Sequence, residues 1–221
     1  MTDSPNTIAC LLKHRPRRSW QHALVGTALV VTILFTGCTT LYSPTRLHAL
    51  TWPERQAQLT QLLSWRAKGA LTAFDGNQAM TGYFSWRQST SNYQLNVSGP
   101  MGIGGFVIIG SPNQVSLRQE TSQTVSAKTP ELLMRSQLGW SLPVSSLIYW
   151  IRGLPDPHYL AQVTLDHLNH LSTLRQEGWQ IQLYGFTSIN GIDLPTHIIL
   201  RYAHTSLPTQ IIRLRITHWS A

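Results

Sequence analysis

The stretch "AKGALTAFDGNQAMTGYFSWRQ", residues 67–88, predicts two antiparallel strands joined by a tight turn. Before the turn at residues 75–77, apolar Leu71 and Ala73 alternate with Thr72. After it, Met80, Gly82, Phe84 and Trp86 alternate with polar or exposed-type residues in the same way. A period of two is typical of a strand with one buried face, and an Asp-Gly-Asn sequence favours a hairpin connection. The fold therefore begins as antiparallel sheet.

Further runs with the same alternation lie on the carboxy-terminal side of this hairpin. They are residues 93–99, 103–110, 115–119, 171–176, 179–186, 197–202 and 210–219. Together they predict a mainly β protein of the α+β class, with a sheet of roughly nine to eleven strands. Antiparallel strands in such number tend to curl into a barrel or a sandwich.

Three segments break the period of two and predict helices. Thr51, Pro53 and Glu54 make a helix start, and leucines on one face extend the predicted helix over about 52–66. A second start lies at Thr129-Pro130-Glu131. Residues 144–152 predict a short apolar helix that ends at Gly153, and a helix apolar on most sides must be buried against the sheet.

The first 37 residues resemble a lipoprotein signal peptide. Basic residues precede "ALVGTALVVTILF", residues 23–35, which is uncharged but too short to span a bilayer. Small Thr36 and Gly37 then precede Cys38, and this order resembles the bacterial lipobox, in which the cysteine receives diacylglycerol and an N-acyl chain. An ordinary secretory signal or an uncleaved anchor, with Cys38 incidental, remains the alternative.

The lipobox implies a division of the chain. Residues 1–37 would be removed, residues 38–50 would form a lipidated tether, and residues 51–221 would form the domain. Thr39, rather than Asp, follows the cysteine. By the lipoprotein sorting rule this implies the outer membrane, with the domain on its periplasmic face.

The composition is basic and poor in charge. The formal net charge is +8 and only 12% of residues are charged. No run of basic residues with interleaved aromatics is present, so nucleic acid is not an expected partner. The positive charge suits acidic lipid head groups or an acidic protein.

No catalytic or metal motif fits its expected context. Ser141 in "GWSLP" lacks the second glycine of a nucleophile elbow. His167 and His170, with Asp166, could touch a metal, but solvated loop histidines are the favoured interpretation and no metal site is predicted. The cluster "GIGGFV" lacks the third glycine of a dinucleotide site. The chain is therefore predicted not to be an enzyme.

A loop between two predicted strands contains an apolar residue with no regular element to bury it. Met101 stands between Pro100 and Gly102. A side chain of this kind meets a partner or a membrane, or it folds back onto the domain; both interpretations remain open.

The segments "GYFSWRQ", "NVSGPMGIGGFVI" and "LGWSLPVSSLIYWIRGLP" resemble the LolB family of outer-membrane lipoprotein receptors over about residues 52–219. The resemblance implies an incomplete antiparallel barrel closed by helices around an apolar cavity for acyl chains. Phe84, Trp86, Ile148, Tyr149 and Ile151 could line that cavity, with ordinary core packing as the alternative. Pro100, Met101 and Gly102 match an exposed Pro-Leu-Gly loop that aids delivery into the bilayer, with Met101 in place of the leucine.

The same resemblance implies the function and the partners. The protein would accept lipoproteins from a periplasmic carrier of the LolA type by binding their acyl chains, and would insert them into the inner leaflet of the outer membrane. Its partners would be the carrier, the cargo's acyl chains and outer-membrane phospholipid, and it would act as a monomer with no cofactor beyond the lipid on Cys38. A lipid-anchored barrel for another apolar ligand and a secreted esterase remain the alternatives.

Overall fold

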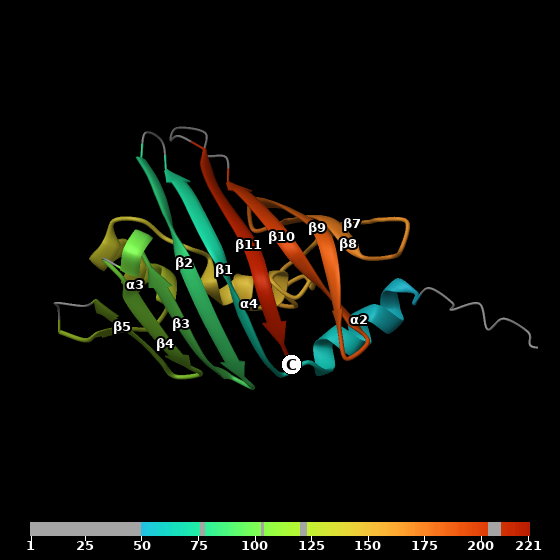
Figure 1. Ribbon diagram of the computed structural model, residues 1–221, viewed down its shortest axis with the longest axis horizontal. Coiled ribbons are helices and arrows are strands. Elements are labelled where there is room, and N and C mark those ends of the chain that lie inside the picture. Colours follow the sequence, from blue (N-terminus) through green and yellow to red (C-terminus); the bar gives the residue numbers. More distant parts are fainter. Residues whose placement is uncertain (1–49, 76–77, 103, 120–122, 203–208) are drawn as a thin grey trace, which may run out of the picture. The chain divides into compact units, whose positions relative to one another are not determined.

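A single curved sheet of eleven antiparallel strands dominates the computed structural model (Figure 1). The structure describes residues 50–75, 78–102, 104–119, 123–202 and 209–221. Across the sheet the strands run β6-β5-β4-β3-β2-β1-β11-β10-β9-β8-β7. The edge strands β6 and β7 do not pair with each other, so the sheet stays open. The predicted mainly β fold, an incomplete barrel with helices, is confirmed.

The first half of the sheet is a meander of six strands. They are β1 (Ser64–Asp75), β2 (Gln78–Ser89), β3 (Asn92–Ser98), β4 (Phe106–Ser111), β5 (Gln114–Gln119) and β6 (Val125–Ala127). In the quoted stretch, β1 and β2 pair in register from Ser64 opposite Ser89 to Asp75 opposite Gln78. The alternation of the sequence therefore becomes two faces, with Phe84 and Trp86 buried and Tyr83 and Arg87 exposed.

The second half is a meander of five strands. They are β7 (Gln162–Leu165), β8 (Leu171–Gln176), β9 (Trp179–Ile189), β10 (Ile192–Tyr202) and β11 (Gln210–Ser220). The two halves join where β11 pairs with β1, and the register shifts there between Lys68 and Gly69. A side chain at position 69 would meet the carbonyl oxygen of Arg215 at 2.0 Å, so only glycine fits this close approach.

Three α-helices of the described residues accompany the sheet: α2 (Trp52–Gln61), α3 (Pro130–Leu138) and α4 (Val144–Trp150). The start predicted at 129–131 is confirmed, because Thr129 Oγ1 accepts a hydrogen bond from the Leu132 amide at 3.3 Å. In Figure 1 α4 lies behind the strands; Leu147 of this helix and Ile151 at its C-cap are buried in the core between helix and sheet.

The predicted helix 52–66 is too long. Helix α2 ends at Gln61, and β1 begins at Ser64. Trp65 is the reason, because it is 2% exposed and its ring packs 5.5 Å from those of both Trp86 and Trp219. Burying this large aromatic side chain on the inward face of the sheet outweighs the apolar spacing that favours a longer helix.

Candidate functional site

The inward face of the sheet and helix α4 enclose an entirely apolar space. Its lining residues are Leu71, Phe84, Trp86, Leu95, Val97, Leu142, Leu147, Ile151 and Leu214. The free volume is about 10 Å³, which is room for no more than about one water molecule. The interior is therefore apolar, as the sequence predicts. The sequence does not show that side chains fill this interior and leave no open cavity.

Three of the five predicted cavity residues meet in this interior and two do not. Phe84, Trp86 and Ile151 lie together, at 5%, 1% and 0% exposure. Ile148 and Tyr149 are partly buried against the core but line a separate groove of about 270 Å³ beside α2, so the structure does not bring them into this interior. A helix turns about 100° per residue, and the face of α4 that carries Leu147 and Ile151 therefore differs from the one that carries Ile148 and Tyr149. A role in acyl-chain binding stays a prediction for all five.

The amino-terminal end of α4 is held by carboxylates from elsewhere in the chain. Pro143 at its N-cap offers no side-chain hydrogen bond. Glu131 of α3 replaces it, because its Oε1 accepts from the Ser145 amide at 2.8 Å and its Oε2 accepts from the Ser145 hydroxyl at 3.1 Å. The Ser146 hydroxyl lies 2.8 Å from Asp156 Oδ2 and 2.7 Å from Glu177 Oε2. Hydrogen bonds to these carboxylates thus stabilise the amino-terminal end of α4.

Arg152 holds the other end of α4, and the sequence offered no signal for it. Its Nη1 donates to the carbonyl oxygens of Leu59 and Leu62, at 3.0 and 2.9 Å, and its Nε donates to the Ile148 carbonyl. Among the described residues no carboxylate forms an ion pair with it. Burial lowers the pKa of Arg152 from its ordinary value, with Tyr149 opposing the shift. A buried cation thus links α4 to the carboxy-terminal end of α2, where helix carbonyls favour positive charge.

The loop predicted to contact membrane is exposed. Residues Pro100–Gly102 form one 3₁₀ turn between β3 and β4, closed by a 3.0 Å hydrogen bond from the Gly102 amide to the Gly99 carbonyl. Met101 is 94% exposed and has a positive φ of 60°, an uncommon conformation for a residue with a side chain. The alternative that Met101 folds back onto the domain is therefore wrong. Its role at a membrane stays a prediction.

The two histidines that were predicted to be solvated differ in exposure. His167 is exposed, but His170 is buried and stacks on Phe186 with ring centres 4.0 Å apart. His170 Nδ1 lies 2.9 Å from Asp166 Oδ2, and its Nε2 lies 3.2 Å from Asp193 Oδ2. The description of His170 as solvated was wrong. In the part of the chain that the structure describes, no three His, Cys, Asp or Glu side chains are arranged so that they could hold a metal ion.

The same cluster ties α2 to the second half of the sheet. Arg55 of α2 forms an ion pair of 2.8 Å with Asp193 of β10. Burial opposes ionisation of Asp193, but hydrogen bonds from Arg55, His170 and Ser188 prevail and lower its pKa. The pKa of Asp166 is lowered in the same way, because hydrogen bonds from His170 and Leu168 outweigh the opposing effect of burial.

These lowered pKa values predict loss of stability in acid. A carboxylate with a lowered folded-state pKa stabilises the fold above its unfolded pKa, about 3.9, and that contribution is lost as pH falls through the folded value. We expect the free energy of unfolding, measured in urea, to fall steeply below about pH 4. Asp193→Asn should be less stable at pH 7 and show a shallower acid dependence; an unchanged profile would contradict this role for Asp193.

Cys38 and the predicted divisions at residues 37 and 50 lie outside the described residues or at their edge, so they stay predictions. Of the helices that the structure does describe, none combines the length and apolar character needed to cross a bilayer.

Comparison with known protein families shows to which family this chain belongs. Residues 63–219 match the model of the family "Outer membrane lipoprotein LolB". The chain belongs to the LolB family. Its assignment to the localisation of outer-membrane lipoproteins, made from the sequence, is confirmed at this level.

Individual LolB relatives support the match over most of the chain. The outer-membrane lipoprotein LolB of Coxiella burnetii (strain RSA 493 / Nine Mile phase I) is 35% identical over 85% of this chain and 88% of its own. That of Pseudomonas savastanoi pv. phaseolicola is 36% identical over 76% of this chain and 83% of its own. Among solved structures, a LolA superfamily protein from Nitrosomonas europaea is 11% identical with a TM-score of 0.49, covering 78% of this chain and 94% of its own.

Proposed function

We propose that this chain is the outer-membrane receptor that takes lipoproteins from a LolA-like periplasmic carrier and inserts them into the inner leaflet of the outer membrane. Membership of the LolB family supports the general role. The observation that carries the acyl-chain step is the apolar interior between α4 and the sheet, bounded by Phe84, Trp86, Leu147 and Ile151. The domain is anchored through lipid on Cys38 and faces the periplasm, it acts as a monomer, and it needs no other cofactor.

Acyl chains enter by exchanging places with α4. The interior is filled at rest, so the helix must move outward before a chain can lie against the sheet. Exposing a buried leucine or isoleucine costs about 1.5–3 kcal/mol, whereas each methylene of an incoming chain contributes about 0.8 kcal/mol. A fatty chain therefore offsets the loss of the helix contacts. The empty protein closes again, and no water-filled apolar cavity has to be maintained.

Release needs no chemical step. A bilayer holds acyl chains by the same apolar transfer, without the cost of displacing a helix. The chains therefore pass from the carrier through this interior to the membrane down a free-energy gradient. Ser141, the serine of the incomplete elbow, lies with its hydroxyl 3.5 Å from the Glu131 carbonyl oxygen. We propose no catalysis for it.

Cargo transfer between purified components tests the proposal. The full-length protein is incubated with a carrier–lipoprotein complex, and cargo is then followed into vesicles added last. We expect cargo to leave the carrier, appear on this protein, and enter the vesicles. Cargo that stays with the carrier while a small apolar ligand binds tightly would instead support a barrel for another ligand. An acyl mass on Cys38 in mass spectrometry tests the anchor separately.

A further inference from the structure

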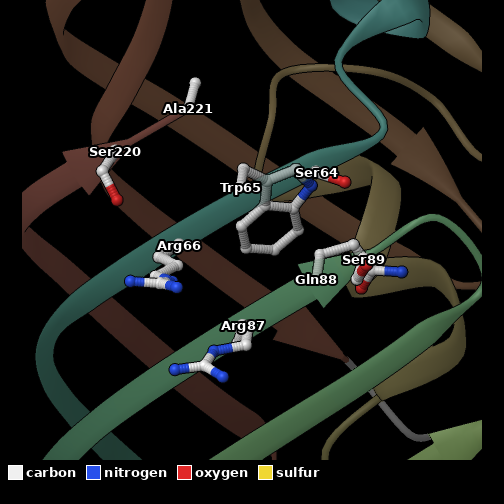
Figure 2. A pocket seen from close by; sticks show the side chains of 8 residues that line it. All are labelled: Ser64, Trp65, Arg66, Arg87, Gln88, Ser89, Ser220 and Ala221. Atoms are coloured by element: carbon white, nitrogen blue, oxygen red, sulfur yellow. The ribbon is translucent and has the colours of Figure 1, made fainter.

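Two arginines lie directly opposite each other on the outward face of the sheet. Arg66 of β1 pairs in register with Arg87 of β2, and both are exposed. Figure 2 shows their side chains extending from the two neighbouring strands in the same direction. Among the described residues neither forms an ion pair. Like charges directly opposite on neighbouring strands destabilise a sheet, and a bound anion would offset that cost.

The groove around this arginine pair offers further hydrogen-bond donors. In one row across β11, β1 and β2 the register places Ser220, Arg66 and Arg87 side by side. Ser64 and Ser89 lie opposite each other two residues along the strands. The open groove has a volume of about 520 Å³ and is lined by no acidic side chain, but Ala221 brings the chain's terminal carboxylate to its edge (Figure 2). Guanidinium groups beside hydroxyls are the donors that phosphate prefers, since each guanidinium can make two parallel hydrogen bonds.

Positive charge continues along the same face. Lys68 lies opposite Ser85, Arg215 opposite Ala70, and Arg213 opposite Thr72, and all three basic side chains are exposed. The carboxylates with described contacts are used elsewhere: Glu54 with Thr51, Glu131 with Ser145, Asp156 and Glu177 with Ser146, Asp166 with His170, and Asp193 with Arg55. The outward face of β1, β2 and β11 is thus a basic surface with the arginine groove at one end.

We propose that this groove binds the phosphate of an anionic phospholipid head group and so seats the domain on its membrane. The inference rests on the proposed anchoring to the outer membrane. Tyr83, 63% exposed, lies on the same face between the cations and β3, and tyrosine is suited to the head-group layer. Ser98 lies opposite Tyr83, and the loop at Pro100–Gly102 follows after Gly99. A membrane on this face would therefore also lie near Met101.

Binding of soluble short-chain lipids to the full-length protein in an uncharged detergent tests the groove. Calorimetric titrations would use dihexanoyl phosphatidylglycerol, dihexanoyl phosphatidylcholine and inorganic phosphate. We expect the anionic lipid to bind, and Arg66→Gln/Arg87→Gln to weaken it about tenfold or more through loss of charge-assisted hydrogen bonds. The double variant should unfold at the same or a higher temperature, because the like-charge contact is relieved.

Arg118→Gln/Arg175→Gln is the matched control. It removes the same charge from exposed strand positions on β5 and β8 and should keep full affinity. Equal weakening by the control, or unchanged affinity in the groove variant, overturns the proposal. Inorganic phosphate binding as tightly as the lipid makes it a free-phosphate site and overturns the lipid assignment. A groove variant with intact lipid affinity but slower cargo uptake assigns the groove to an acidic carrier instead. The titration contains neither carrier nor cargo, so its outcome is independent of the transfer test.

Discussion

Met101→Glu should fold and accept cargo normally but deliver it to membranes at least about tenfold more slowly, because burying a carboxylate in a bilayer is costly. The side chain at this position is 94% exposed, so its replacement should change the free energy of unfolding by no more than about 0.5 kcal/mol. The measurement is the rate at which a labelled lipoprotein passes from the loaded protein into vesicles. Cargo uptake from the carrier is followed in the same experiment.

Two variants give this experiment its controls. Met101→Leu keeps the apolar volume and should preserve delivery. Leu160→Glu places the same charge at another apolar position, 97% exposed and just before β7, and it should have no effect on delivery. Equal loss in Leu160→Glu would mean that any exposed apolar residue matters, and normal delivery by Met101→Glu would remove the loop from the insertion step.

Arg152→Leu should lower the free energy of unfolding by about 2–4 kcal/mol, since hydrogen bonds from a charged group are lost and buried carbonyls lose their donor. The guanidinium group makes three hydrogen bonds, to Leu59, Leu62 and Ile148. Urea denaturation followed by tryptophan fluorescence measures the loss. Amide hydrogen exchange should also increase in α4, because the variant releases the link between that helix and α2.

Arg152→Lys is the conservative control for this contact. An ammonium group keeps the charge but cannot reproduce the fork that reaches α2 and Ile148 together, so we expect an intermediate loss. Wild-type stability in Arg152→Leu would show that packing alone holds α4. Wild-type stability with faster cargo uptake would instead indicate that Arg152 restrains the opening of the helix without adding to the stability of the fold.

Most of the sheet was predictable because its strands keep a period of two. The alternation from 67 to 88 identified β1 and β2 and placed Phe84 and Trp86 on the buried face. Strands β6 and β7 were not predicted, because they have only three and four residues, and such short, largely exposed strands show no alternation of apolar and polar residues. The end of α2 was misjudged because leucine spacing continues past it, and only the packing of Trp65 reveals where the sheet begins.

Site residues too were predictable only where the neighbouring sequence determines their position. An apolar helix is predictable from the sequence, but the sequence does not show which face of that helix meets the sheet. Ile151 therefore lies in the apolar interior, whereas Ile148 and Tyr149 line the groove beside α2. The role of Arg152 depends on carbonyls about 90 residues away, for which no local pattern exists. The opposition of Arg66 and Arg87 does not follow from the turn predicted at 75–77, because counting outward from that turn pairs Arg66 with Trp86. The observed pairing of Asp75 with Gln78 shifts the register by one residue and places Arg66 opposite Arg87.

The pairing of β1 with β11 has a consequence for how the chain acquires its structure. Every other pair of neighbouring strands is consecutive in sequence, whereas this seam joins residues more than a hundred positions apart. Contacts of such long range form slowly, because the intervening chain must first be brought together. A polypeptide that emerges with its amino terminus first therefore leaves one edge of β1 unpaired until the last strand arrives. During that interval the edge is open to mispairing with other chains.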